Sequence, residues 1–240
     1  MSKAALRTAK PVVARPTAAA RSAPAAAAPA AYSADLVTLT SPQSRGAEAI
    51  RALRAHLLAQ HLNAGRRSLV VCAATVDVGC TFVATNLAVA MAQVGIKTLL
   101  VDADLRAPAI DKIIRPPAPA TGLVQCLSAQ GAPISDYIQD DVLPNLSVFY
   151  SGGPAANAQE LLTHDWFEEV MNHCLREYDL TIVDTPPANA SADVRRISNV
   201  MGYSLIVARR NRSVVADVKT LADQLADDHV KVVGAVMNTD

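Results

Sequence analysis

Three aspartates follow apolar stretches of this chain at positions where their carboxylates could bind one metal ion. Asp102 and Asp104 come directly after the run Leu99–Val101, and Asp184 follows the run Leu180–Val183. Side chains two residues apart on an extended segment point to the same side, so Asp102 and Asp104 are expected to reach one magnesium ion or its water shell. A single aspartate after a strand is usually a turn residue. The three aspartates together favour a shared site.

The segment Ala74–Thr81 has the layout of a phosphate-binding loop. It follows the apolar run Ser68–Ala73 and precedes a helical pattern, so free N–H groups at the start of a helix would face a phosphate. Gly79 and Thr81 match the end of the usual pattern, in which glycine, lysine and serine or threonine follow one another. We expect Gly79, Thr81 and Phe82 to lie at a bound nucleotide, with the Thr81 hydroxyl and Asp184 near the metal.

Three residues of this loop depart from the usual pattern. Cys80 stands at the lysine position among the predicted nucleotide-binding residues, Ala74 replaces the first glycine, and Asp77 adds an acid. A lysine at position 80 would place positive charge on the phosphates, which a thiol cannot do. A thiol at a helix N-terminus is expected to have a lowered pKa, and a thiolate would repel phosphate. Taken alone, the loop is therefore a weak match.

Apolar runs alternate with helical patterns from Pro42 onward. The predicted strands are Ser68–Ala73, Thr98–Val101, Leu146–Tyr150, Leu180–Val183, Ser204–Ala208 and Val230–Met237. The predicted helices are Ala47–Leu62, Thr81–Gln93, Ala158–Arg176, Ala192–Met201 and Ser213–Asp227. Continuous aliphatic runs are typical of strands buried on both faces. The alternation predicts an α/β domain of the P-loop NTPase type, with helices on both faces of a parallel sheet and ligands at the carboxyl ends of the strands.

The composition restricts the class of protein. Hydrophobic residues make up 51% of the chain and aromatic residues only 4%, so the core must be aliphatic. A formal net charge of +0 argues against a surface built for nucleic acid. The four cysteines lack metal-binding spacing, and no apolar run is long enough to span a bilayer. We therefore expect a reduced, cytoplasmic protein that binds no nucleic acid.

Residues 1–35 differ from the rest of the chain. They are rich in alanine and proline and carry the basic residues Lys3, Arg7, Lys10, Arg15 and Arg21, with no acid before Asp35. Repeated proline prevents a continuous helix, and the segment has too little apolar surface for a core. We predict a disordered arm over residues 1–35 that acts as a tether, because lipid-binding segments are usually denser in charge. The folded domain is predicted to span residues 36–240.

The ordered set of motifs resembles the bacterial tyrosine kinases of capsule and exopolysaccharide synthesis, a branch of the MinD/ParA-like P-loop ATPases. Four segments carry the resemblance: VDADLRAP at 101–108, SGGPAANAQELL at 151–162, TIVDTPP at 181–187 and VGAVMN at 233–238. The resemblance implies catalytic roles for Asp102 and Asp104, near magnesium and the acceptor hydroxyl. It also implies that Asp102 and Asp184 serve the magnesium ion, and that Asn238 borders the adenine.

The helix that begins near residue 47 matches a further motif of this family. Glu48, Arg51 and Arg54 fit the pattern E-x-x-R-x-x-R, with which one subunit packs onto the next. The resemblance therefore implies a homo-oligomer with these residues at the interface. The alternative is an exposed helix that carries ordinary ion pairs between residues three apart.

Two departures from the family decide which function the sequence favours. The lysine is replaced by Cys80, and the tyrosine cluster that the family carries after its last strand has no counterpart after Tyr203. We expect a pseudokinase, a regulatory partner of a membrane polysaccharide co-polymerase at the inner membrane.

Whether the chain is an enzyme stays open. One alternative is an active tyrosine kinase or ATPase that controls chain length, with Arg106 or another cation in place of the lysine. Another is a ParA- or MinD-like positioning ATPase. Mg²⁺ with ATP or ADP is the expected cofactor if nucleotide binds at all.

Overall fold

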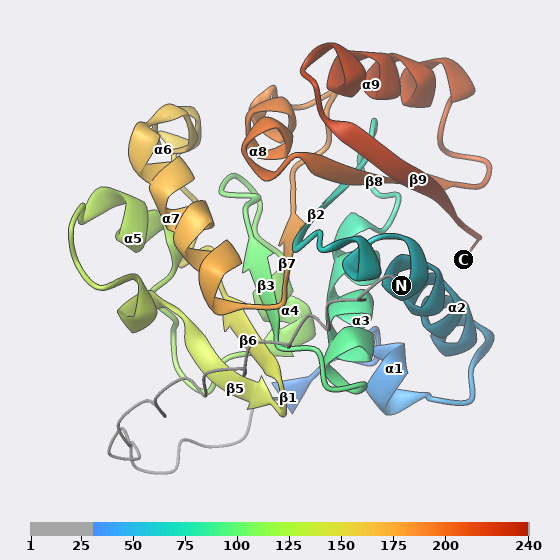
Figure 1. The fold of residues 1–240 in the computed structure, drawn as a ribbon, viewed down its shortest axis with the longest axis horizontal. Helices are drawn as coiled ribbons and strands as arrows, with labels where there is room; N and C mark the ends of the chain where they lie inside the picture. Colours follow the sequence, from blue (N-terminus) through green and yellow to red (C-terminus); the bar gives the residue numbers. More distant parts are fainter. Residues whose placement is uncertain (1–30, 240) are drawn as a thin grey trace, which may run out of the picture.

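The computed structural model describes residues 31–239, and the first 30 residues of the predicted arm lie outside the described part. A seven-stranded sheet of order β5-β6-β3-β7-β2-β8-β9 lies at the centre of these residues (Figure 1). Its strands are β2 (Ser68–Cys72), β3 (Thr98–Asp102), β5 (Gln139–Leu143), β6 (Leu146–Phe149), β7 (Leu180–Asp184), β8 (Tyr203–Arg209) and β9 (Lys231–Asn238). All neighbours are parallel except β5, which runs antiparallel to β6. The predicted fold class is confirmed, whereas strand β5 was not predicted.

Helices cover both faces of this sheet, as predicted. One apolar core holds residues of α1 (Val37–Thr40), α2 (Arg45–Gln60), the 3-10 turn η1 (Leu62–Ala64), α3 (Cys80–Ala92) and α4 (Ile110–Ile113). The other holds residues of α5 (Leu123–Ser128), the 3-10 turn η2 (Ile134–Tyr137), α6 (Ala158–Thr163), α7 (Asp165–Glu177), α8 (Asp193–Met201) and α9 (Val215–Asp227). Along β2 the side chains alternate between the two cores, with Val70 in one and Val71 in the other. This alternation explains why the strand is aliphatic at every position.

Helix α3 fixes the position of the phosphate loop. Every residue from Val83 to Ala92 is buried, so the helix has no polar face. A helix that is apolar all round must lie inside the protein. Small residues such as Ala84 and Ala88 let it lie close to its neighbours. Because the body of α3 is enclosed, its first residue, Cys80, is held at the carboxyl end of the sheet.

The folded part of the chain begins before the predicted boundary at residue 35. Strand β1 (Ala31–Tyr32) pairs antiparallel with β4 (Ile114–Arg115), and Leu36 is completely buried. The side chain of Asn86 on α3 accepts hydrogen bonds from the backbone N–H of Thr38, at 3.1 Å, and from its hydroxyl, at 3.2 Å. Residues 31–35, which the composition assigned to the arm, therefore belong with the domain in this structure.

The single helix predicted over Ala158–Arg176 is instead two helices. The chain is extended at His164 (φ −64°, ψ 144°), which separates α6 from α7. The Nδ1 atom of His164 accepts a hydrogen bond from the backbone N–H of Trp166 at 3.1 Å and so caps α7. Helix α2 begins at Arg45, after the cap residue Ser44, and not at Ala47 as predicted. Among the described residues, no helix is long and apolar enough to cross a membrane.

Candidate nucleotide and metal site

The sheet topology brings the three predicted loops together. Strand β7 lies between β2 and β3, and Asp102 and Asp184 are register partners at the ends of β3 and β7. Val71, near the end of β2, is the register partner of Asp184 on the other side. The phosphate loop that follows β2 therefore opens beside both carboxylates. This is the edge of the sheet at which the sequence placed the site.

The phosphate loop has a tight backbone that depends on glycine at one position. Gly79 has φ 93° and precedes α3, and a Cβ atom there would lie 2.5 Å from the Nδ2 atom of Asn238. Only glycine tolerates both the left-handed backbone and this contact. The Nδ2 atom of Asn238 donates a hydrogen bond to the carbonyl of Val78 at 3.0 Å. The structure thus brings the predicted residues Gly79 and Asn238 together, although they lie far apart in the sequence.

Cys80 does not have the lowered pKa that the sequence suggested. Burial raises the pKa of this thiol well above its ordinary value, and the nearby Asp184, Cys72 and Asp104 raise it further. Desolvation and carboxylates therefore outweigh the effect of the helix N-terminus. The expected thiolate is corrected to a neutral thiol. Cys80 neither repels phosphate by charge nor supplies the positive charge of a lysine.

The two carboxylates at the strand ends are buried and incompletely hydrogen-bonded. Asp102 and Asp184 are each 1% exposed, and the Oδ1 atom of each has no partner among the described residues. The Oδ2 atom of Asp102 accepts hydrogen bonds from the N–H groups of Ala109 and Ile110, both at 3.1 Å. Burial raises the pKa of Asp102 to about 7. Burial, and then the neighbouring Asp102, raise the pKa of Asp184 well above its usual range, whereas a hydrogen bond from the Thr81 side chain lowers it.

These orphaned oxygens fit a divalent cation. A buried oxygen without a hydrogen-bond donor is costly, and a bound cation satisfies it and favours the charged carboxylate. The described residues contain no group of three or more His, Cys, Asp or Glu side chains suited to a metal. Magnesium here would therefore need the Thr81 hydroxyl and the oxygens of water or phosphate in addition to Asp184 and Asp102.

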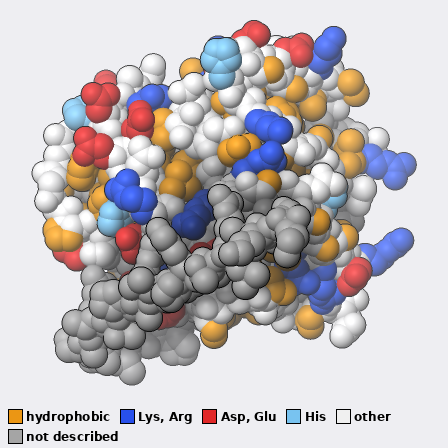
Figure 2. Space-filling model, in the orientation of Figure 1, with side chains coloured by type: hydrophobic (Ala, Val, Ile, Leu, Met, Phe, Trp, Pro, Cys, Tyr) orange, Lys and Arg blue, Asp and Glu red, His pale blue; other side chains and the backbone are white. Residues whose placement is uncertain are grey.

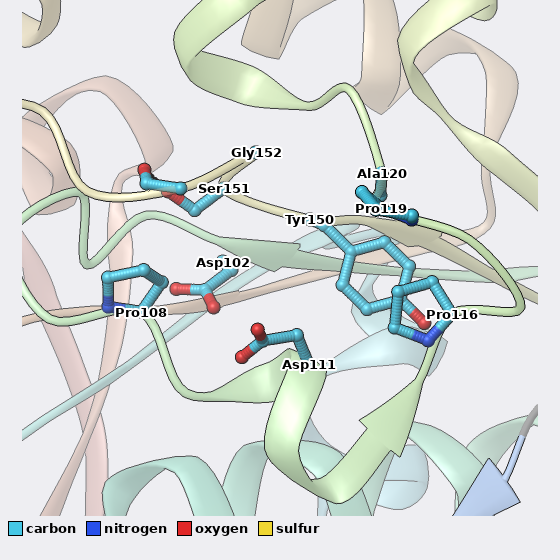
Figure 3. A pocket seen from close by; sticks show the side chains of 10 residues that line it. Asp102, Pro108, Asp111, Pro116, Pro119, Ala120, Tyr150, Ser151 and Gly152 are labelled. Atoms are coloured by element: carbon cyan, nitrogen blue, oxygen red, sulfur yellow. Dashed lines mark hydrogen bonds between the residues drawn. The ribbon is translucent and has the colours of Figure 1, made fainter.

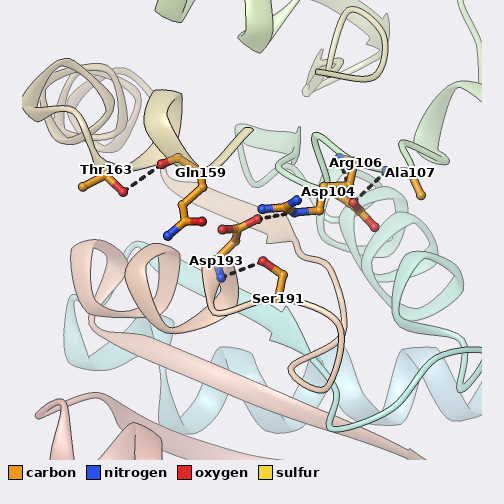
Figure 4. A network of polar contacts seen from close by, with 7 residues as sticks. All are labelled: Asp104, Arg106, Ala107, Gln159, Thr163, Ser191 and Asp193. Atoms are coloured by element: carbon orange, nitrogen blue, oxygen red, sulfur yellow. Dashed lines mark hydrogen bonds and ion pairs between the residues drawn. The ribbon is translucent and has the colours of Figure 1, made fainter. Parts of the chain in front are cut away.

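The side chains of Asp104 and Arg106 are both engaged in contacts, Asp104 within its own loop and Arg106 with helix α8. The Oδ1 atom of Asp104 accepts hydrogen bonds from the N–H groups of Arg106, at 3.1 Å, and Ala107, at 2.9 Å. The Nε atom of Arg106 contacts the Oδ2 atom of Asp193 at 2.8 Å (Figure 4). Asp193 is only 4% exposed, so its carboxylate depends on this arginine. Arg106 is thus engaged beside α8, and its predicted contact with nucleotide stays a prediction.

Several cavities among the described residues open next to the predicted site. A cavity of about 220 Å³ is lined by Asp102 and Asp111, whose carboxylates both lie toward it, and by Tyr150 (Figure 3). A larger cavity of about 670 Å³ is lined by Gly79, Phe82 and Asn238, together with residues that the sequence did not single out: Asp35, Val37, Ser44, Arg45, Gly46, Ile113 and Arg209. The predicted nucleotide-binding residues Gly79, Phe82 and Asn238 therefore share one hollow. Over the face drawn in Figure 2, acidic and basic side chains are interspersed rather than separated into patches.

Comparisons with known proteins identify the family. Residues 69–210 match the family described as AAA domain. The tyrosine-protein kinase YwqD of Bacillus subtilis is 30% identical over 204 residues, which cover 85% of this chain and 85% of YwqD. The chain belongs to the bacterial tyrosine kinase family. Etk of Escherichia coli is 31% identical over 202 residues, and the Ralstonia solanacearum protein EpsB is 33% identical over 200. The chain spans only 28% of the length of Etk and 26% of that of EpsB.

Solved structures agree with this assignment. The kinase domain of Escherichia coli Etk superposes with a TM-score of 0.78 at 30% identity, covering 85% of this chain and 79% of that domain. The chimerical protein CapA2B2 gives a TM-score of 0.76 at 28% identity and covers 85% of this chain and 89% of that one. The cell division ATPase MinD of Pyrococcus furiosus, with a TM-score of 0.62 at 23% identity, shares the fold.

The residues that the family motif assigns to an oligomer interface make contacts within the chain. The Nη1 atom of Arg51 lies 2.5 Å from the Oε2 atom of Glu48, and Arg51 also donates to the carbonyl of Pro42. The Nη1 atom of Arg54 donates to the carbonyl of Ala90, near the end of α3, at 3.2 Å. The ion pair between residues three apart, which was the alternative explanation, is therefore present. An interface on α2 stays a prediction.

Proposed function

We propose that this member of the bacterial tyrosine kinase family is a regulatory protein with an impaired nucleotide site, which acts in polysaccharide synthesis or export. The observation that carries the proposal is Cys80, a residue without positive charge at the position of the phosphate-binding lysine. The fold and the strand-end carboxylates persist around it, so the chain keeps the shape of the family without its central cation. A docking surface requires shape and charge, whereas phosphoryl transfer also requires charge stabilisation at the phosphates.

The electrostatics of the loop support weak nucleotide binding. Asp77 lies inside the loop with φ 57°, a conformation that few non-glycine residues adopt. Its carboxylate is exposed, whereas Asp102 and Asp184 are buried at the strand ends next to the loop. Without a lysine, magnesium must compensate for these carboxylates as well as for the phosphates. We therefore expect Mg·ATP to bind weakly or not at all.

The chain's own residues would have defined roles if nucleotide binds. Magnesium would supply charge neutralisation of the phosphates when bound. Asp184 and the Thr81 hydroxyl would hold it, and Asp102 would accept hydrogen bonds from its water shell. Gly79 leaves the helix N-terminus open to the phosphates, and Asn238 would border the base. Asp104 would lie at the acceptor hydroxyl.

The partner that we propose is the cytoplasmic end of a membrane polysaccharide co-polymerase. The support is the family to which the chain belongs and the likeness to the chimerical protein CapA2B2. Binding to such a partner would hold the chain at the inner membrane. The domain assigned to this role comprises residues 36–240 with the short strand β1 before it, and residues 1–30 would link it to other parts of the assembly.

Calorimetry and genetic complementation together test this proposal. The purified full chain is titrated with Mg·ATP and Mg·ADP, and ATP hydrolysis is assayed in parallel. In a deletion strain, the Cys80→Ala and Asp184→Ala alleles are expected to restore polymer amount and length as well as the wild-type allele does. Rescue only by alleles that hydrolyse ATP would contradict the proposal, as would tight Mg·ATP binding by the wild type.

A second candidate function is an active tyrosine kinase or ATPase. The orphaned Oδ1 atoms of Asp102 and Asp184 favour it, because they are suited to the magnesium ion that phosphoryl transfer uses. ATP-dependent phosphate release by the wild type, abolished by Asp102→Asn, would establish this alternative. A ParA- or MinD-like positioning role is disfavoured, because the motif at Glu48–Arg54 and the segment at 151–162 are not expected in those proteins.

A further inference from the structure

Arg209, the last residue of β8, and Arg212, in the turn that follows, contact the phosphate loop. The Nη1 atom of Arg209 donates a hydrogen bond to the backbone carbonyl of Asp77 at 3.0 Å. The Nη1 atom of Arg212 forms an ion pair with the Oδ2 atom of Asp77 at 2.9 Å. We propose that Arg209 supplies the phosphate loop with the positive charge that Cys80 lacks, and so anchors the phosphates of a nucleoside diphosphate or triphosphate. This inference rests on the nucleotide site proposed above.

Hydrogen bonds across the turn that follows β8 hold Arg209 in place. The backbone N–H of Arg209 donates to the Oγ atom of Ser213 at 2.9 Å. The carbonyl of Arg209 accepts hydrogen bonds from the N–H groups of Arg212, at 3.1 Å, and Ser213, at 2.9 Å. Asn211, between them, has φ 61°, a left-handed conformation that asparagine adopts more readily than most residues. The arginines therefore reach the loop from a fixed base, which reduces the entropy lost when an anion binds.

The two arginines act differently on the charge of the loop. Arg212 faces the Asp77 carboxylate, so these two charges offset each other. Both side chains are well exposed, at 53% and 71%, so their ion pair adds little stability. Arg209 faces a neutral carbonyl, and it forms no ion pair with a described residue. Around Asp77, the positive charge of Arg209 is therefore not offset by an ion pair with a described residue.

Arg209 also reaches the cavity in which a nucleotide would lie. It lines the cavity of about 670 Å³ together with Gly79, Phe82 and Asn238. Arg209 and Asn238 are register partners at the ends of β8 and β9. Asn238 donates to the carbonyl of Val78, the residue after the one that Arg209 contacts. The two strand ends thus satisfy successive loop carbonyls, which lowers the negative potential that an incoming phosphate would meet.

Arg106, the cation that the sequence suggested, is less suitable for this role. Its partner Asp193 is 4% exposed, and removing Arg106 from it would leave a buried carboxylate unpaired. The Arg209 guanidinium gives up only a hydrogen bond to a backbone carbonyl when it turns toward a phosphate. Its positive charge and its remaining N–H donors can then face the phosphate oxygens.

The test measures three probes that differ in their phosphate content. The full chain, in wild-type form and as Arg209→Gln and Arg209→Lys, is titrated by calorimetry with Mg·ADP, magnesium pyrophosphate and adenosine. Arg209→Gln is expected to weaken binding of ADP and pyrophosphate about tenfold to a hundredfold, as for loss of a charge-assisted contact, and to leave adenosine unchanged. Arg209→Lys should retain most of the affinity. Arg176→Gln, which removes an exposed arginine at the end of α7, is the matched control for net charge and should have no effect.

A double-mutant cycle separates Arg209 from the general stability of the loop. In the Cys80→Lys background, the lysine would contact the phosphates instead. The loss of ADP affinity caused by Arg209→Gln should therefore be at least severalfold smaller. The inference is overturned if Arg209→Gln leaves ADP affinity unchanged, if it weakens adenosine equally, or if the Arg209→Lys protein loses as much affinity as Arg209→Gln. It is also overturned if the wild type binds neither ADP nor pyrophosphate, a result that leaves the regulatory docking function intact. Conversely, complementation that depends on ATP hydrolysis would overturn the docking function and leave the role of Arg209 standing.

Discussion

Residues 77 and 80 both reduce the positive charge of the phosphate loop. Cys80 stands in place of a lysine, and Asp77 adds an acid, which forms an exposed ion pair with Arg212. The two changes act through charge rather than through the shape of the loop, because Gly79 keeps the left-handed backbone that opens the helix N-terminus. Restoring charge should therefore restore binding without rebuilding the fold.

Cys80→Lys should strengthen Mg·ATP binding by about 1–3 kcal/mol, the range of a charge-assisted contact. The lysine would also offset Asp184 and Asp104, which already lie close enough to raise the pKa of the thiol. Calorimetric titration with Mg·ATP measures the change. Cys80→Ala, which adds no charge, should leave the affinity unchanged. Equal gains from lysine and alanine would show that steric crowding, not missing charge, limits binding.

The buried carboxylates should make stability depend on pH. Burial raises the pKa of Asp102 from 3.8 to about 7. Because the folded state holds this proton more tightly than the unfolded state, the contribution is fully present below the unfolded pKa and is lost as pH rises through about 7. The raised pKa of Asp184 acts in the same direction. The free energy of unfolding should therefore fall as pH rises from mildly acidic to mildly alkaline values.

Asp102→Asn should remove part of this dependence and stabilise the protein more at alkaline than at acidic pH. The asparagine cannot ionise, so no charge is buried when pH rises. Urea unfolding of the wild type and the variant across the neutral range measures the difference. Added Mg²⁺ should stabilise the wild type at alkaline pH, because it binds the ionised carboxylates. A constant difference between the two proteins at all pH values would show that Asp102 keeps an ordinary pKa.

The sequence predicted where the candidate site residues lie in the fold, but not their partners. Asp102 and Asp184 stand at strand ends and Gly79 at a helix start, which are positions that local patterns reveal. The partner of Arg106 is 87 residues away, and Arg212 meets Asp77 across 135 residues. No local spacing indicates such pairs, since the sheet order alone brings them together. The pKa of Cys80 was misjudged for a similar reason, because burial in the folded protein, and then carboxylates distant in the sequence, raise it.

At the scale of elements, buried strands were easier to predict than edges and breaks. Strands β2, β3 and β7 lie in the middle of the sheet, so both faces select aliphatic residues. Strand β5 lies at an edge, and its sequence QDDVL is half-exposed and polar, so no hydrophobic pattern marks it. The break between α6 and α7 was missed because it depends on the capping side chain of His164, whereas Ser, Thr, Asp and Asn are the usual caps.

Asn86 connects α3 to the segment that precedes α2. It is completely buried, and its Nδ2 atom donates to the carbonyls of Asp35, at 2.8 Å, and Phe82, at 2.9 Å. Its Oδ1 atom accepts from the N–H and hydroxyl groups of Thr38. Removing this side chain leaves buried donors and acceptors without partners.

Asn86→Ala should therefore lower the free energy of unfolding by about 2–4 kcal/mol, as for other losses of a buried hydrogen-bond network. Urea unfolding measures the loss, and hydrogen exchange should show that α1 opens before the sheet. Asn172→Ala, at an exposed position on α7, is the matched control and should change stability very little. Equal effects of the two substitutions would contradict the role of Asn86 as an anchor.

At the scale of the whole molecule, α2 is the element through which assembly can be tested. Arg51 and Arg54 also serve the monomer, because they bind the carbonyls of Pro42 and Ala90. If either arginine is substituted, a loss of assembly could not be distinguished from a loss of folding. The side chain of Glu48 is 73% exposed, and among the described residues it forms an ion pair with Arg51 alone. Glu48 is the member of the motif that separates the two effects.

Glu48→Lys should prevent self-association and docking while the monomer stays folded. Reversing the charge in the first turn of α2 costs about 0.5–1 kcal/mol through the helix dipole and the lost pair with Arg51, too little to unfold a domain. At an interface between copies, the same lysine would face arginines of the neighbour and be repelled. Glu168→Lys, an exposed acid in the first turn of α7, has the same cost and is the matched control. Sedimentation velocity of the chain, alone and with the cytoplasmic end of the proposed co-polymerase, should show assembly for the wild type and for Glu168→Lys but not for Glu48→Lys. Polymer length in cells should change only with Glu48→Lys. Assembly that survives Glu48→Lys, or that Glu168→Lys disrupts equally, would show that α2 does not form the interface.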